Sequence, residues 1–235
     1  MNTLRKYNLI LLLILMAVVN IACKKNSTMS NIPANPGMLK YLALGDSYTI
    51  GQSVSPDQRF PEITVELLKS QGKSMGAPRI IATTGWTTRD LLNALNTIQP
   101  SKDYDIVTLL IGVNNQYQGK NINEYRDEFT QLLTRAIQYA GDRKTSVFVL
   151  SIPDYSVTPF AQGSDINRIS MEIDQFNAVN KEIAFALGVN YLDITPISRE
   201  GKNDNTLHAS DGLHPSGKQY RRWAELLAPL ISKVL

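Results

Sequence analysis

The chain has 235 residues, of which 43% are hydrophobic and 19% are charged, a composition typical of one globular domain with a substantial core. Its formal net charge is only +3, which argues against a nucleic-acid-binding protein, because such a protein needs a strongly basic surface. One cysteine and two histidines exclude an internal disulfide and leave too few ligands for a zinc site. There is also no glycine-rich phosphate or dinucleotide motif, so we expect neither a metal nor a cofactor.

The first 22 residues have the pattern of a secretory signal peptide. Arg5 and Lys6 precede an apolar run over residues 9–22, which is shorter than the roughly 20 apolar residues of a membrane span. The run ends directly before Cys23, whose position resembles the lipidation cysteine of bacterial lipoproteins. We therefore expect Cys23 to carry a lipid anchor that holds the protein at a membrane of the bacterial cell envelope. The alternative is an ordinary signal peptide followed by an incidental cysteine.

Residues 23–39 are polar and rich in Asn, Ser and Pro, without helix or strand periodicity. This composition predicts a tether between the anchor and a folded domain over residues 40–235.

The folded domain begins with the stretch YLALGDSYTI, in which an apolar run over residues 41–44 ends in Gly45, Asp46 and Ser47. Glycine permits backbone angles that other residues resist, and short polar side chains favour turns and helix starts. We expect a buried strand that turns sharply, with Asp46 as a structural residue of the turn and Ser47 at the carboxyl end of the strand.

Apolar runs then alternate with segments of helical periodicity along the rest of the chain. Further strands are expected at residues 79–82, 105–111, 145–152 and 189–194. Helices are expected at residues 60–71, at 87–98 with Ile98 on the apolar face, around 125–137, and at 166–187. Pro215 is expected to open a last helix, because proline suits the first helical position; that helix should bury residues 220, 223, 226, 227, 230 and 231.

This alternation predicts a parallel five-stranded sheet covered by helices on both faces, an α/β/α sandwich. Catalytic residues of open parallel sheets lie at the carboxyl ends of the strands. Ser47, Gly85 and residues 112–115 mark three of those ends.

The two histidines are His208 and His214, and Asp211 lies three residues from each of them. Histidine is the side chain best suited to act as a general base near neutral pH. From the residues alone, either histidine can pair with Asp211. His208 lies in a polar stretch typical of a solvated loop, whereas His214 lies directly before Pro215 at an expected helix start.

Four short blocks together resemble the SGNH, or GDSL-type, hydrolases. They are Gly45-Asp46-Ser47-Tyr48, Gly85, Gly112-Val113-Asn114-Asn115 and Asp211-Gly212-Leu213-His214, in the order and approximate spacing of that family. The resemblance spans nearly the whole domain and implies a flavodoxin-like three-layer fold.

The resemblance also implies the roles of the site residues. Ser47 would be the nucleophile, His214 its general base and Asp211 the acid that orients the imidazole. The backbone N–H groups of Ser47 and Gly85 and the side-chain amide of Asn114 would form the oxyanion hole.

The implied activity is serine-dependent hydrolysis of acyl esters, by a short-chain esterase or a carbohydrate deacetylase acting on a small ester or an acylated glycan. Alternatives within the family are a lysophospholipase, a thioesterase or an acyltransferase, and outside it a non-catalytic glycan-binding lipoprotein. The loop over residues 151–165 follows the fourth expected strand, so Tyr155 and Phe160 either line the substrate site or pack the loop onto the domain. Trp86, beside Gly85, has the same two possibilities.

Overall fold

The computed structural model describes residues 37–235. The expected signal peptide, the expected lipid anchor on Cys23 and the tether up to residue 36 lie outside the described residues. From residue 37 onward, no helix is both long enough and apolar enough to cross a membrane.

Five parallel strands form one sheet in the order β2-β1-β3-β4-β5. The strands are β1 (Tyr41–Gly45), β2 (Arg79–Ala82), β3 (Ile106–Leu110), β4 (Val147–Leu150) and β5 (Asn190–Leu192). This is the flavodoxin-like order, in which the chain reverses direction across the sheet between β1 and β3. The expected fold class is therefore confirmed, and ligand-binding loops belong at the carboxyl ends of β1 and β3.

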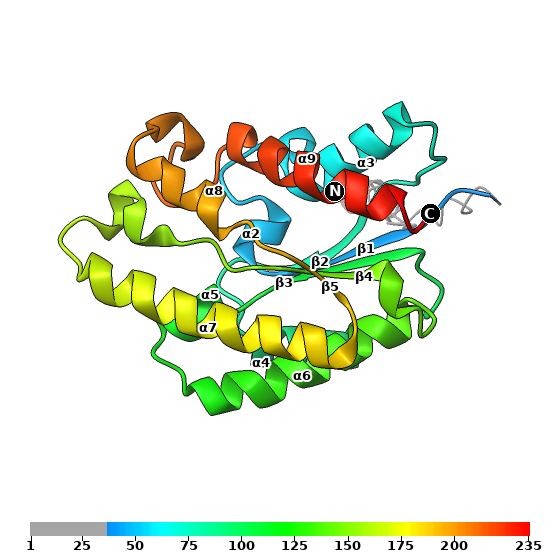
Figure 1. The fold of residues 1–235 in the computed structure, drawn as a ribbon, viewed down its shortest axis with the longest axis horizontal. Coiled ribbons are helices and arrows are strands. Elements are labelled where there is room, and N and C mark those ends of the chain that lie inside the picture. The colour runs from blue at the N-terminus through cyan, green and yellow to red at the C-terminus, as the bar shows by residue number, and fades with distance from the viewer. Residues whose placement is uncertain (1–36) are drawn as a thin grey trace, which may run out of the picture. The chain divides into compact units, whose positions relative to one another are not determined.

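Helices cover both faces of the sheet (Figure 1). One face carries α3 (Phe60–Ser70) and α9 (Gly217–Ser232), and the other carries α4 (Thr88–Ile98), α6 (Ile122–Tyr139) and α7 (Ile166–Leu187). The shorter helices are α2 (Ser47–Ile50), α5 (Val113–Tyr117) and α8 (Thr195–Arg199). Short 3₁₀ helices occur at η2 (Pro56–Gln58), η3 (Lys144–Ser146), η4 (Tyr155–Val157), η5 (Pro159–Ala161), η6 (Glu200–Lys202) and η7 (Asn205–Leu207).

The burial pattern explains this architecture. Every residue of β1, β3 and β4 is buried, as expected for strands covered on both faces. Helices α3, α4, α6 and α9 bury one apolar stripe each and leave the opposite side largely polar.

Three expected strands are longer in the sequence pattern than in the structure. The strand expected at 105–111 loses one residue at each end in β3. The first turn of the segment 145–152 is η3, and β4 ends at Leu150. Beyond that point, the backbone N–H of Ile152 donates to the side chain of Asn177 at 2.7 Å instead of continuing the ladder. The segment expected at 189–194 likewise shortens to β5.

The last helix also begins later than expected. Its N-cap is Ser216, whose side chain accepts a hydrogen bond from the Gln219 backbone, so Pro215 lies outside the helix. Two predictions of burial are wrong as well: Leu226 is 45% exposed and Ile98 is 41% exposed. Both lie at the margin of an apolar stripe, where periodicity does not separate the core from its rim.

Candidate active site

The turn after β1 leaves no room for any residue but glycine at position 45. A Cβ there would collide with the Thr49 side chain and with the backbone oxygen of Leu110. Gly45 does not adopt a positive φ angle, so the expectation that it supplies unusual backbone angles is wrong. Glycine is needed here because β3 and α2 pass close to its backbone.

Asp46 is the N-cap of α2, in agreement with its predicted structural role in the turn. One carboxylate oxygen accepts a hydrogen bond from the backbone N–H of Tyr48 at 3.0 Å. The side chain is completely buried, and this burial raises its pKa to about 7 although the backbone N–H groups of Tyr48 and Gly112 favour the charged form. The cap fixes Ser47 as the first residue of α2, at the edge of a pocket.

His214 is held by Asp211. The Nδ1 atom of His214 lies 2.6 Å from Oδ2 of Asp211, whose other oxygen accepts the backbone N–H groups of Leu213 and His214 at 3.0 Å. The hydroxyl of Ser53 also donates to Oδ2, at 2.6 Å. Partial burial raises the pKa of Asp211, but these hydrogen bonds outweigh it and hold the pKa well below its usual range.

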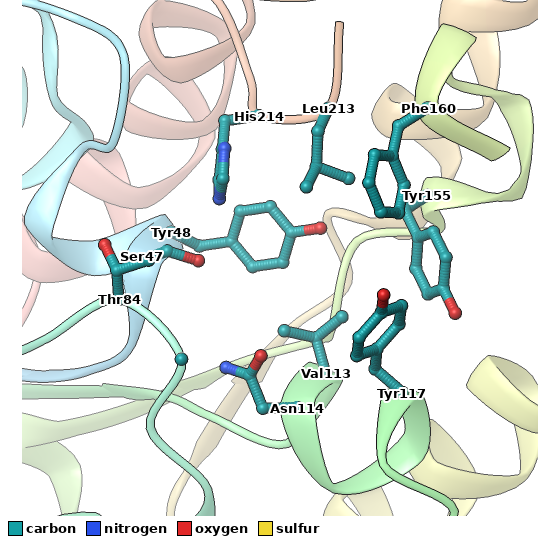
Figure 2. Close-up of a pocket in the computed structure, with 11 residues that line it drawn as sticks. Ser47, Tyr48, Thr84, Val113, Asn114, Tyr117, Tyr155, Phe160, Leu213 and His214 are labelled. Carbon is teal, nitrogen blue, oxygen red and sulfur yellow. The ribbon is translucent and has the colours of Figure 1, made fainter. Parts of the chain in front are cut away.

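A charged Asp211 carboxylate accepts hydrogen bonds only, so it selects the tautomer of His214 that carries its proton on Nδ1. The Nε2 atom is then free to accept a proton. The His214 ring extends into the same pocket that Ser47 lines (Figure 2). The hydrogen bonds of residues 37–235 do not include one between the Ser47 hydroxyl and this ring, a contact that commonly tightens only when substrate binds.

His208 is not part of this pocket. Its Nε2 atom lies 3.1 Å from the backbone oxygen of Gly201, and the residue forms a backbone bridge with Pro215. Of the two histidines that the sequence left as alternatives, the structure therefore pairs His214 with Asp211.

Three potential oxyanion donors border the pocket, which Ser47, Gly85 and Asn114 all line. In the part of the chain that the structure describes, the backbone N–H groups of Ser47 and Gly85 donate to no other group. The Asn114 amide donates to the backbone oxygen of Trp86 at 2.9 Å, and its nitrogen has a second hydrogen to offer. Gly85 has a φ of 86° and a Cβ there would meet nothing within 4 Å, so glycine is required for its backbone angle rather than for close approach.

A buried polar network lies behind these donors and was not anticipated from the sequence. The Asn115 side chain accepts the backbone N–H of Thr88 at 3.0 Å and donates to its hydroxyl at 2.7 Å. That hydroxyl donates to Glu128, a buried carboxylate that also pairs with Arg89 at 2.6 Å. The network joins α4, which follows Gly85, to α5, which carries Asn114. The available signal was a glutamate on the buried face of α6, one turn from Tyr125.

The pocket beside Ser47 has a volume of about 170 Å³. It is lined by Ser47, Tyr48, Thr84, Gly85, Val113, Asn114, Tyr117, Tyr155, Phe160, Leu213 and His214. Tyr155 and Phe160 both line this pocket, and Tyr155 also packs into the hydrophobic core, so it fits both of the alternatives that the sequence left open. Trp86 does not line the pocket and packs against the core instead.

Within residues 37–235, no group of three or more His, Cys, Asp or Glu side chains is arranged to hold a metal ion.

Comparison with protein families gives one match, between residues 43–222 and the GDSL-like Lipase/Acylhydrolase family. Comparison with the curated proteins gives no significant match.

Several solved structures share the fold. A lipase, Lip_vut3, from a goat rumen metagenome has a TM-score of 0.66 at 20% identity, over 82% of this chain and 97% of its own. The structure of TesA has a TM-score of 0.65 at 17% identity, over 83% and 99% of the two chains. Axe2, an acetylxylan esterase from Geobacillus stearothermophilus, has a TM-score of 0.61 at 20% identity, over 82% and 94%. At these identities, the similarity establishes the fold.

Proposed function

The chain belongs to the GDSL-like lipase/acylhydrolase family and is a carboxylic ester hydrolase, and we propose that it works through an acyl-enzyme on Ser47. The observation that carries this proposal is the 2.6 Å pair between Asp211 and His214, whose ring enters the pocket that Ser47 lines. A serine hydroxyl is a weak nucleophile until a base removes its proton, and this pair supplies an oriented base.

In the first half-reaction, Nε2 of His214 takes the proton of the Ser47 hydroxyl as the oxygen attacks the ester carbonyl. The positive charge that forms on the imidazole is stabilised by Asp211, whose lowered pKa keeps it ionised. His214 then gives its proton to the departing alcohol oxygen. In the second half-reaction, His214 activates a water molecule, which releases the acid and restores Ser47.

The carbonyl oxygen becomes negatively charged in both half-reactions. We assign its stabilisation to the backbone N–H groups of Ser47 and Gly85 and to the second amide hydrogen of Asn114. The support for this assignment is that all three border the pocket and that the two backbone groups have no other acceptor in the described part of the chain. Such donors act without reorganisation because the turns already hold them in place.

Small esters of short acyl groups, among them acylated glycans, are the proposed substrates. One solved neighbour is an acetylxylan esterase, and this likeness supports an acylated carbohydrate. A membrane location through Cys23 is proposed from the sequence pattern, and mass spectrometry of the mature protein tests it. An unmodified Cys23 would remove that part of the proposal.

The mechanism is tested by replacing Ser47 with alanine. We expect Ser47→Ala to keep the circular dichroism spectrum and melting temperature of the parent, because the change removes one oxygen at the pocket edge. Hydrolysis of methyl acetate, followed by acid release, should fall by at least about a thousandfold. His214→Ala should do the same. A folded Ser47→Ala protein with activity near that of the parent would refute the acyl-enzyme mechanism.

A further inference from the structure

The pocket has two chemically different halves. The polar groups of the reaction, from Ser47, Asn114 and His214, gather at one end (Figure 2). The other end is formed by aromatic and aliphatic side chains, among them Tyr117, Tyr155 and Phe160, Val113 and Leu213 (Figure 2). A substrate held at Ser47 therefore has one substituent that faces apolar walls.

Three aromatic rings from three separate segments meet at this apolar end. Tyr117 ends α5, Tyr155 begins η4 and Phe160 lies in η5. The ring centroids of Tyr117 lie 6.2 Å from those of both Tyr155 and Phe160, within the range of aromatic contacts. Tyr155 is buried, but Tyr117 is 59% exposed and Phe160 is 48% exposed. Apolar rings left open beside a reactive serine gain free energy when a ligand covers them.

The lining residues also indicate which ligands do not fit this end. None of the side chains that line the pocket is aspartate, glutamate, lysine or arginine. A sugar ring placed among Val113, Leu213 and Phe160 would lose the water around several hydroxyl groups and find few partners for them. The volume of about 170 Å³ is close to that of an apolar cavity of about 150 Å³ that binds benzene. Because this volume includes the polar end that holds the ester group, the apolar end has room for a group no larger than one phenyl ring.

Tyr48 adds one polar feature to this apolar end. Its ring lies between Ser47 and the three other aromatic rings, and its hydroxyl points away from Ser47 toward them (Figure 2). The residue is only 3% exposed, and its hydroxyl has no hydrogen-bond partner among residues 37–235. The hydroxyl oxygen is open to the pocket, unlike that of the fully buried Tyr220, so a ligand in the pocket can bond to it.

We propose that, among the small esters considered above, the site selects one with an aromatic ring on one side of the carbonyl in preference to an acylated glycan. This ring binds between Tyr48, Tyr117 and Phe160, and a polar substituent on it bonds to the Tyr48 hydroxyl. The inference rests on the proposed ester hydrolysis at Ser47 and adds the class of group that the site selects. The ring belongs either to the acid or to the alcohol of the ester, and the two sources are separated by experiment.

Two isomeric esters distinguish a ring on the acid from a ring on the alcohol. Methyl phenylacetate carries a phenylmethyl group on its acyl side, and benzyl acetate carries the same group on its alcohol side. Methyl acetate and methyl hexanoate serve as references without a ring, and each rate is divided by that of the same ester with hydroxide. We expect kcat/KM for one of the two isomers to exceed that of both references by about tenfold or more. Equal values for all four, or a higher value for methyl hexanoate, would overturn the proposal.

The walls are tested with Phe160→Ala and with Phe185→Ala as a matched control. Phe185 is also an exposed phenylalanine, but it lies in α7 beside Tyr191 and Lys181, outside the pocket. The preference for the ring ester should fall severalfold in Phe160→Ala and stay at the parent value in Phe185→Ala. Equal preferences in the two variants would contradict a role of Phe160.

The hydroxyl is tested with Tyr48→Phe and the 2-, 3- and 4-hydroxy derivatives of the preferred ring ester. In the parent protein, one derivative should be cleaved severalfold faster than the unsubstituted ester, because its hydroxyl forms a hydrogen bond with Tyr48 in a pocket from which the ring excludes water. Tyr48→Phe should remove that advantage while the ring preference remains. An advantage that persists in the variant would assign it to another group.

Ring binding is also measured without turnover. In Ser47→Ala, binding of phenylacetate and of benzyl alcohol is followed by nuclear magnetic resonance, and Phe160→Ala in the same background should weaken the tighter of the two. If no ester is cleaved but the ring binds at Phe160, the proposed mechanism fails and the pocket assignment stands. If esters are cleaved and no ring binds, only the pocket assignment fails.

Discussion

At the scale of single residues, Asp46 shows how a carboxylate beside a nucleophile can be structural. One oxygen caps α2, and the other is buried without a hydrogen-bond partner among the described residues. Burial raises its pKa from the ordinary 3.8 to about 7. Between these two values the folded protein binds a proton that the unfolded chain has released. The contribution of Asp46 to the stability therefore declines as the pH rises from about 4 to 7 and is constant above that range.

Asp46→Asn removes this titration while its side-chain oxygen can still cap α2. We expect the difference in melting temperature between pH 5 and pH 8 to be smaller in the variant than in the parent protein. Thermal unfolding at these two pH values, followed by circular dichroism, measures it. A difference as large as that of the parent would assign the pH dependence to other groups.

At the scale of elements, the contact between α4 and α5 determines how far apart the oxyanion donors lie. Gly85 precedes α4 and Asn114 lies in α5, and the two helices are joined by the hydrogen bonds between Thr88 and Asn115. Glu128 of α6 accepts a hydrogen bond from the Thr88 hydroxyl. The oxyanion hole thus depends on side chains that never touch the substrate.

Thr88→Val tests this dependence, because valine has nearly the shape of threonine without the hydroxyl. It leaves Asn115 and Glu128 each without one partner, which costs about 1–3 kcal/mol of stability. We expect kcat to fall by about tenfold with a smaller change in KM, since the lost stabilisation belongs to the transition state. Thr97→Val is the matched control: this exposed threonine of α4 bonds only within its own helix, and its variant should retain full activity. Equal activity of both variants would show that the network does not position the donors.

The sequence predicted the elements better than the side-chain partners. Apolar runs and periodicity located the five strands and the five long helices of the described residues. The trace is most direct for β1, β3 and β4, which are buried throughout, and for helices that bury one stripe. The short helices α2, α5 and α8 have too few residues for such a trace. The pairing of Thr88 with Asn115 joins residues 27 positions apart, and no local pattern records it.

The site residues also divide into those that the sequence predicts and those that only the structure identifies. Ser47, Asp211 and His214 stand out in short motifs, and the structure brings them to one edge of the sheet. The choice between His208 and His214 needed the structure, because both lie three residues from Asp211. The residues of the pocket walls could be predicted only in part, because Tyr117 and Phe160 come together through folding and no sequence spacing relates them.

At the scale of the whole molecule, the site rests on the layer formed by α3 and α9. Trp223 of α9 is completely buried and contacts the rings of Tyr220, Phe60 and Tyr48, at centroid distances of 5.0, 6.2 and 6.4 Å. Tyr48 in turn contacts His214 at 5.8 Å. One aromatic cluster therefore supports both the helix layer and the floor of the pocket.

Trp223→Ala removes the centre of this cluster. Truncation of a buried tryptophan costs about 3–5 kcal/mol, which for a domain of this size lowers the melting temperature by roughly 6–20 °C. Leu226→Ala, in the same helix but at a side chain that is 45% exposed, should lower it by only a few degrees. Thermal denaturation of both variants compares the two losses in melting temperature. Because Tyr48 loses its support as well, Trp223→Ala should also weaken catalysis at temperatures where it is still folded. Unchanged activity there would show that the floor of the pocket is held by the turn at Asp46 and not by the helix layer.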